Sequence, residues 1–224
     1  MSEQAPELQE PERPRLPTPW IIWALVGAIA VSYAMFMFLP PDVQEELDLA
    51  FGLMPARYDA SNPVHFRSLA AMIAPLFGHA FLHVAWWHAA TNGFFLFILG
   101  RWPALRLGWW RFLILFFVSS VAGALAYLLI NPGSEEIAIG ASGAVCGVFM
   151  AYFLSVRPRW QDALREPAIR NQLGMIFFLN VVVMGVLSEL EVFPIAWEAH
   201  LGGFIGGAVA YIALERPMPR LPFA

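Results

Sequence analysis

The chain alternates long apolar runs with short polar connections, a pattern typical of membrane-spanning helices. A helix needs about 20 apolar residues to cross the hydrocarbon core of a bilayer. Six segments come near that length: Trp20–Leu39, Leu82–Leu99, Phe112–Ile130, Ala141–Val156, Leu173–Leu187 and Ala199–Leu214. The pattern predicts an all-α polytopic membrane protein with one six-helix domain, residues 20–215, between short tails at residues 1–19 and 216–224. The first tail is rich in proline and glutamate and is expected to be disordered.

Composition supports a membrane protein and gives no sign of a bound metal. Of the 224 residues, 59% are hydrophobic and 13% are charged, and the mean hydropathy is +0.61. A soluble domain carries about 25% charged residues, so most of this surface is expected to face lipid. The single cysteine, Cys146, excludes an internal disulfide. A His79/His83 pair is the one metal alternative, but it lacks acidic ligands, so neither a metal nor a cofactor is expected.

The charges predict an orientation in the membrane. The chain has no lysine, and eleven of its 13 arginines fall in tails or loops on one side of the predicted spans. Only Arg57 and Arg67 fall on the other side, where most of the acidic residues lie. The positive-inside rule then places both termini in the cytoplasm. The acidic N-terminal tail carries no import signal, which favours a bacterial inner membrane, and the scattered arginines make a poor case for nucleic-acid binding.

The unusual polar residues gather where three of the spans begin. With this orientation the second, fourth and sixth spans all start near the outer face, so their first residues share one depth. His83, His88 and Asn92 open the second, Ser142 opens the fourth and His200 opens the sixth. Polar residues inside a membrane are costly and indicate function by default. The alternative is structural, because a serine among small residues also lets helices approach closely.

Two features favour a catalytic interpretation of Ser142 and His200. The fourth span covers about 24 Å, less than the ~30 Å core, so the preceding loop must dip into the membrane, which requires a protein or water-filled surrounding. Gly203 and Gly207 lie on the His200 face of its helix. If they pack on Gly143 and the glycine one turn later, Ser142 and His200 come to matching levels. A histidine that activates a serine is the core of acyl-transfer catalysis.

The remaining polar residues have predicted supporting roles. Glu198 is too close along the chain to orient the His200 ring, which favours a Ser-His dyad. His88 and Asn92 are one helical turn apart and share a face. They either form an interhelical hydrogen-bonding pair or donate to an oxyanion. His83 falls on the opposite face of the same helix and is expected to hold the preceding loop.

The segments HAFLHVAWWHAATN, GASGAVCG and AHLGGFIGG together resemble the rhomboid family of intramembrane serine proteases. The resemblance covers residues from about 20 to 214 and implies a minimal six-helix core. It implies that Ser142 is the nucleophile and His200 the general base. It also implies that His88, Asn92 and the Ser142 N–H bind the oxyanion, that Gly140 shapes this hole, and that His83 is structural.

The sequence departs from the family pattern at two places. Cys146 stands where the family often has a tyrosine beneath the catalytic histidine ring. The Trp-Arg pair of the first outer loop is missing, with Ala74-Pro75 in its expected place and Phe66-Arg67 further upstream. These departures concern the orientation of His200 and the anchoring of that loop.

The resemblance implies hydrolysis of a peptide bond in, or just outside, the transmembrane segment of another protein, with no cofactor. The partners are then transmembrane substrates and the lipid bilayer, and the fifth span and last outer loop control substrate access. Two alternatives remain. One is an inactive relative that binds or escorts membrane proteins, and the other is a proton or ion pathway through the histidines.

Overall fold

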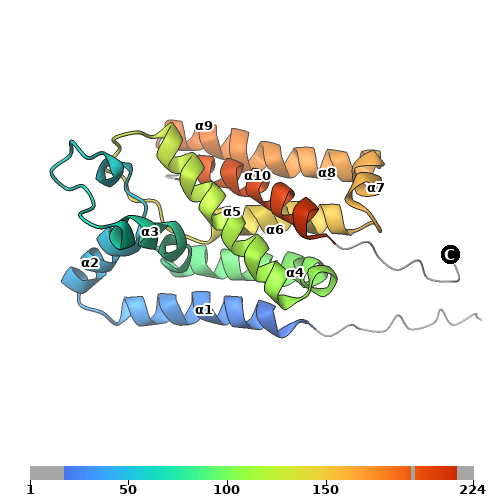
Figure 1. Ribbon diagram of the computed structural model, residues 1–224, viewed down its shortest axis with the longest axis horizontal. Helices are drawn as coiled ribbons and strands as arrows, with labels where there is room; N and C mark the ends of the chain where they lie inside the picture. The colour runs from blue at the N-terminus through green and yellow to red at the C-terminus, as the bar shows by residue number, and fades with distance from the viewer. Residues whose placement is uncertain (1–17, 193–194, 216–224) are drawn as a thin grey trace, which may run out of the picture.

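The computed structural model describes residues 18–192 and 195–215, and the predicted tails lie outside this range except for residues 18–19. The described residues form helices and loops (Figure 1). Within these ranges the β pairing consists of one isolated bridge, between Leu53 and Ala138. The predicted all-α architecture is confirmed.

Ten α-helices and three short helical segments follow one another in the described part of the chain. The α-helices are α1 (Trp20–Met37), α2 (Pro41–Phe51), α3 (Leu69–Gly78), α4 (Trp86–Leu107), α5 (Trp109–Ile130), α6 (Ser142–Ser155), α7 (Trp160–Arg165), α8 (Pro167–Phe177), α9 (Met184–Glu189) and α10 (Trp197–Leu214). The others are the 3-10 turns η1 (Pro55–Tyr58) and η2 (His79–Phe81) and the π-helical η3 (Phe178–Val183). Figure 1 shows α2 and α3 at one end of the bundle, and α7 and the end of α10 at the other.

Each predicted span contains a helix, but not every one of these helices is long and apolar enough to count as a span. Trp20–Met37, Trp109–Ile130 and the continuous helix Pro167–Glu189 qualify alone. Leu69–Phe81 and Trp86–Leu107 qualify only as a pair, bent by 82°. The helix α6 has 14 residues and is a shorter apolar helix. Length and composition therefore support three spans, or four with the bent pair.

The predicted boundaries of the second span are wrong at both ends. Residues 82–85 form a loop after η2, and α4 begins only at Trp86. The helix then continues to Leu107, where Gly108 with φ +78° ends it. Glycine adopts this left-handed conformation without the steric cost that a side chain imposes. His83 therefore lies in a loop and does not open the helix.

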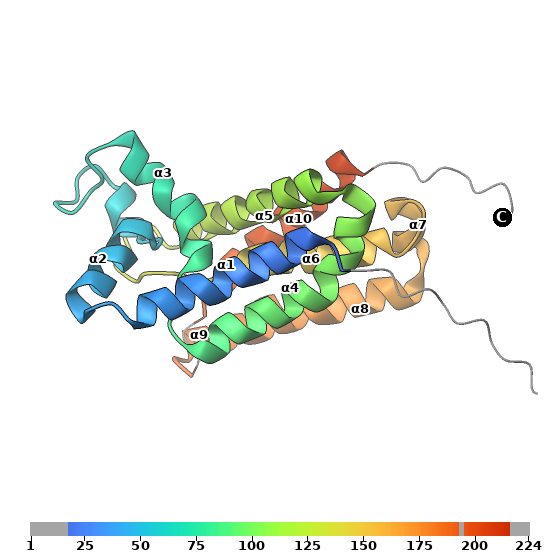
Figure 2. The ribbon, with the colours of Figure 1, turned by 90° about the horizontal axis from the view of Figure 1, so that it is seen from below.

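The predicted contact between the glycine faces of α6 and α10 is confirmed. A Cβ atom built on Gly203 would lie 2.0 Å from the main-chain oxygen of Gly143. A Cβ atom on Gly207 would lie 2.3 Å from the Cα atom of Gly147. No side chain fits between the two helices at these levels. The two helices are in main-chain contact in the middle of the bundle (Figure 2).

A second glycine face of α10 packs on α5, which the sequence did not predict. A Cβ atom on Gly202 would lie 2.3 Å from the main-chain oxygen of Ala122, and one on Gly123 would lie 2.7 Å from that of Ala199. The helix α10 is thus held between α5 and α6 with little side-chain volume on either side. Small residues at such interfaces increase van der Waals contact, which stabilises helix pairs in lipid.

Arg106 joins three helices at the opposite end of α6 from Ser142. Its guanidinium group donates to the main-chain oxygens of Ser155 (2.7 Å), Pro158 (2.8 Å) and Arg157. It also pairs with Glu215 at 3.4 Å. A cation at a helix C-terminus satisfies carbonyl groups that lack helical partners and interacts favourably with the helix dipole.

The close approach of α6 and α10 predicts that Gly203→Ala destabilises the protein. We expect a loss of about 1–3 kcal/mol, because the added methyl group meets the main chain of Gly143, which cannot turn away. Gly27→Ala on α1 is the control, since no atom lies within 4 Å of the built Cβ. That substitution should leave stability unchanged or raise it by up to about 1 kcal/mol. Reversible unfolding in detergent micelles measures both, and equal effects would contradict the packing argument.

Candidate functional site

The loop that leads into α6 is fixed by main-chain hydrogen bonds to the segment between α2 and α3, which is the predicted first outer loop. The N–H of Leu53 donates to the oxygen of Ala138 at 3.0 Å, and the reverse bond is 2.9 Å. The N–H of Ala56 donates to the oxygen of Ser134 at 2.8 Å. The approach to the first residue of α6 is therefore held before the helix begins.

The last two residues before Ser142 contact the region that precedes α4. The N–H of Gly140 donates to the oxygen of His79 at 2.8 Å, and the N–H of Ala141 donates to Nε2 of His83 at 3.4 Å. Gly140 has φ +122°, which strongly favours glycine. A Cβ atom at Gly140 would lie 2.5 Å from Cε1 of His88, so this ring packs directly on the Gly140 main chain.

The predicted position of His83 on a helix is wrong. The sequence placed it on the face of a helix opposite Asn92, but it lies in the loop before α4, where that helical argument does not apply. Its ring packs edge-on against His88, with the ring centroids 4.9 Å apart. With its bond from Ala141, His83 contacts the loop that precedes α6.

Ser142 is the first residue of α6 and is half-buried, and Ala141 precedes it as the helix cap without a side-chain hydrogen bond. The first N–H groups of a helix have no helical acceptor and favour negative charge nearby. A Cβ atom on Gly143 would lie 3.0 Å from the oxygen of Ala199. The neighbours of Ser142 and His200 are thus in contact. No hydrogen bond joins the two side chains in the part of the chain that the structure describes.

His200 is buried, with 7% of its surface exposed, and its Nδ1 lies 3.1 Å from the main-chain oxygen of Asn180 in η3. The sequence did not identify this partner. The one signal in the sequence is that Asn180 is a polar residue inside an apolar run. The carboxylate of Glu198 has a different partner and accepts from Nδ2 of Asn131 at 2.8 Å.

His88 and Asn92 lie on one face of α4 and are joined to each other. Nδ2 of Asn92 donates to the main-chain oxygen of His88 at 3.0 Å, and Asn92 is buried at 5% exposure. One of the two amide hydrogens of Asn92 is thereby used within α4. Nδ1 of His88 is buried without a hydrogen-bond partner.

The structure shows which residues surround the two positions at which the sequence departs from the family pattern. Cys146 is buried in an apolar cluster with Val181 and Phe204. In the first outer loop, the guanidinium group of Arg57 lies over the Phe66 ring, 4.1 Å from its centroid. Arg57, which the sequence analysis used only for orientation, is therefore the basic residue that packs on Phe66.

Arg57 and Tyr58 hold the first outer loop through main-chain acceptors. Arg57 donates to the oxygens of Leu49 and Val64, the latter at 3.3 Å. Tyr58 donates its hydroxyl to the oxygen of Met72 at 3.0 Å. Burial raises the pKa of Tyr58 to about 12, against the opposing effect of the Arg57 charge. The hydroxyl therefore stays protonated and remains a donor at physiological pH.

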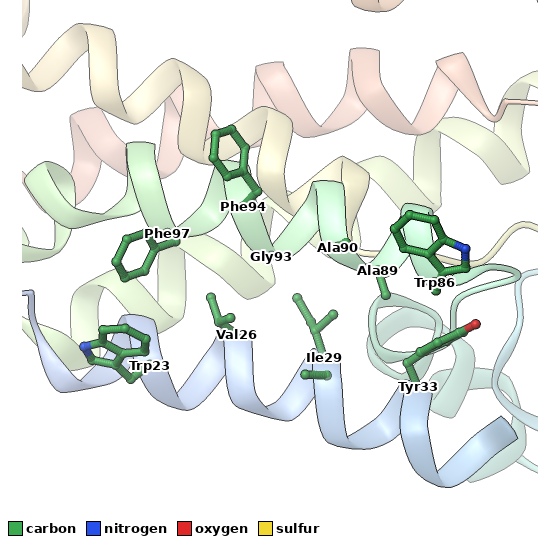
Figure 3. Close-up of a pocket in the computed structure, with 11 residues that line it drawn as sticks. Trp23, Val26, Ile29, Tyr33, Trp86, Ala89, Ala90, Gly93, Phe94 and Phe97 are labelled. Atoms are coloured by element: carbon green, nitrogen blue, oxygen red, sulfur yellow. The ribbon is translucent and has the colours of Figure 1, made fainter. Parts of the chain in front are cut away.

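An apolar groove of about 470 Å³ lies between α1 and α4, away from these polar residues. Figure 3 shows Trp86 and Tyr33 at one end of this groove and Trp23 at the other. Its lining includes none of Ser142, His200, His88 and Asn92. A second apolar hollow, of about 440 Å³, lies between Trp197 and residues 181–190. The lining of the second hollow also includes none of these four residues.

Comparison with known proteins identifies related chains. The family model described as the Rhomboid domain matches residues 70–217. RHOMBOID-like protein 5 of Arabidopsis thaliana is 25% identical, over 92% of this chain and 72% of its own length. The uncharacterized protein Rv1337 of Mycobacterium tuberculosis is 27% identical, over 96% and 82%. Rhomboid-like protease 3 of Toxoplasma gondii is 25% identical, over 69% of this chain and 60% of its own length.

The contact between Gly140 and His88 predicts that Gly140→Ala lowers stability by more than the cost of placing an alanine at a positive φ. Gly133 also has a positive φ, +77°, but no atom lies within 4 Å of its built Cβ, so Gly133→Ala is the matched control. Left-handed backbone costs the alanine at Gly133 about 1–2 kcal/mol, and φ +122° at Gly140 costs at least as much, because it lies further from the left-handed helical region. We expect Gly140→Ala to cost about 1–3 kcal/mol more than the control, because the methyl group displaces the His88 ring.

Unfolding in detergent, together with the ring resonances of isotope-labelled histidine, measures this difference. The His88 signals should move in Gly140→Ala and stay in place in Gly133→Ala. Equal losses of stability with an unmoved His88 ring would show that the ring does not depend on Gly140.

Proposed function

The chain belongs to the rhomboid family, and we propose that it is an active intramembrane serine endopeptidase. Its family and its apolar helices identify it as an integral membrane protein. One observation carries the proposal: the close approach of Gly143 and Ala199, which directly follow Ser142 and directly precede His200 in α6 and α10. The two residue types that an acyl-transfer dyad requires thus come from α6 and α10 at one level of the bundle.

In the proposed mechanism Ser142 attacks the carbonyl carbon of the scissile peptide bond. His200 takes the hydroxyl proton at Nε2 and returns it to the leaving amine, which departs. A water molecule then attacks the acyl-enzyme, again through His200, and releases the second product with Ser142 restored.

The oxyanion of each tetrahedral intermediate is stabilised at the start of α6. The Ser142 N–H lies in the first turn of the helix, where N–H groups lack helical acceptors and the helix dipole favours negative charge. The side chains of His88 and Asn92 are the further donors, and Asn92 has a second amide hydrogen beyond the one used within α4. Gly140 allows the close approach of the His88 ring.

We propose that residues 20–215 form the catalytic unit and cross the membrane six times, with both termini in the cytoplasm. The distribution of arginines supports this orientation. The short helix α6 then reaches only part of the way across, and the loop ahead of it lies below the outer surface. A bacterial cytoplasmic membrane is the proposed location, supported by the mycobacterial relative.

The proposed substrates are transmembrane segments of other proteins. A carbonyl group in a helix is shielded by its hydrogen bond and by neighbouring side chains, so the substrate helix must unwind locally before attack. Small residues at the cleaved bond and helix-breaking residues after it lower the cost of unwinding. An inactive relative that only binds membrane proteins needs neither a serine nor a histidine at these positions, and the presence of both favours the enzyme.

We expect Ser142→Ala to reduce cleavage of a single-span substrate in proteoliposomes by more than about a thousandfold, because the nucleophile is lost. Ser155→Ala is the matched control, since Ser155 ends the same helix and its hydroxyl donates to the Tyr152 oxygen. The control should keep nearly full activity. Unchanged cleavage by Ser142→Ala would remove this residue from the mechanism.

The dyad predicts that losses at Ser142 and His200 do not add. His200→Ala should lower kcat by at least about a thousandfold, and the double variant should be no worse than Ser142→Ala, because the two groups act as one unit. If the fold loss of kcat in the double variant equals the product of the two single-variant losses, the residues act independently.

The proposed topology predicts which loops an impermeant thiol reagent can reach. In a Cys146→Ser background, a cysteine introduced by Ser61→Cys should be labelled from outside intact cells. One introduced by Gln161→Cys should be labelled only after the membrane is made permeable. The reverse pattern would overturn the proposed orientation.

A further inference from the structure

The helix that runs from Pro167 to Glu189 contains a π-helical turn next to His200. Regular α-helix covers Pro167–Phe177 and Met184–Glu189, and the π turn η3 covers Phe178–Val183. A π turn inside an α-helix contains one additional residue and recurs at functional sites. The main-chain oxygen of Asn180, in this turn, lies 3.1 Å from Nδ1 of His200.

This contact determines which nitrogen of the neutral ring carries the proton. A carbonyl oxygen only accepts hydrogen bonds, so Nδ1 is the donor and Nε2 has the free lone pair. A histidine that acts as a general base accepts the serine hydroxyl proton at this free Nε2. We propose that Asn180 is a positioning residue, whose main-chain carbonyl in the π turn holds His200 in its base-competent form. The inference rests on the proposed role of His200 as the base.

The carbonyl takes the place that an aspartate carboxylate has in a Ser-His-Asp triad. Glu198, two residues before His200, binds another partner, since its carboxylate accepts from Nδ2 of Asn131 at 2.8 Å. A main-chain carbonyl is neutral, so placing it inside a membrane protein avoids the desolvation cost of a charged carboxylate. The arrangement orients the ring with a neutral acceptor in place of a charged one.

Two contacts hold the π turn in place. Nδ2 of Asn180 donates to the main-chain oxygen of Ile176 at 2.9 Å, one turn earlier. The next residue, Val181, is buried against Cys146 of α6 and Phe204 of α10. The carbonyl is therefore positioned relative to both helices of the dyad, and Val181 is the one residue of η3 that is buried.

The first experiment measures the tautomer of His200 directly. Histidine labelled with ¹⁵N in the ring is incorporated into the full-length Ser142→Ala protein in lipid nanodiscs, and the His200 signals are assigned by their absence in a Ser142→Ala/His200→Gln variant. The proposal predicts that the neutral ring is protonated at Nδ1. Protonation at Nε2 overturns it, and neither result depends on whether the protein cleaves anything.

The second experiment removes the π turn. Deletion of Val182, whose side chain is 44% exposed, returns the segment to α-helical spacing while both flanking helices keep their faces. We expect kcat to fall about tenfold, the value of one lost orienting hydrogen bond, with KM within about twofold. The fraction of the ring protonated at Nδ1 should fall as well. Val182→Ala keeps the turn and should match the parent in all three measurements.

A folded deletion variant with unchanged kcat and unchanged ring signals contradicts the proposal. If the deletion prevents folding, the tautomer of the Ser142→Ala protein decides the question. Failure of the proposed protease function would be seen in a different measurement. It would appear as cleavage that Ser142→Ala retains, whatever the tautomer of His200.

Discussion

The structure depends on the close approach of α6 and α10, which is possible because no side chain stands between them. Gly203 faces the main chain of Gly143, and Gly207 faces that of Gly147. Apolar side chains gain little by leaving lipid for a protein interior, so helices in a membrane associate through tight contact. This contact fixes the relative height of the two helices, and so places the start of α6 beside the first turn of α10.

The polar groups around Ser142 serve the architecture as well as the proposed chemistry. A loop below the membrane surface must satisfy its N–H and C=O groups within the protein, because lipid offers no hydrogen bonds. Leu53, His79 and His83 supply partners for the main chain of residues 138–141. The site is therefore assembled around a main chain that is already paired, and Ser142 begins its helix from a fixed point.

The sequence predicted the long apolar helices and the glycine contact, because apolar runs and glycines four residues apart are visible in it. It did not predict the shorter helices α2, α3 and α7, which lie outside the six predicted spans. It placed His83 on a helix because nothing in residues 82–85 marks a loop. The contacts of Arg57 and Arg106 could not be predicted, since both side chains bind main-chain oxygens distant in sequence. The π turn was equally hidden, and only the polar Asn180 in an apolar run pointed to that position.

The central claim is that His200 activates the hydroxyl of Ser142, and covalent labelling tests it most directly. A fluorophosphonate reacts with an activated serine and requires no known substrate. After incubation in lipid and digestion, mass spectrometry should find the adduct on Ser142 in the parent protein and none in His200→Ala, with Ser155 unmodified in both. An adduct on another serine, or equal labelling of Ser142 without His200, would contradict the account.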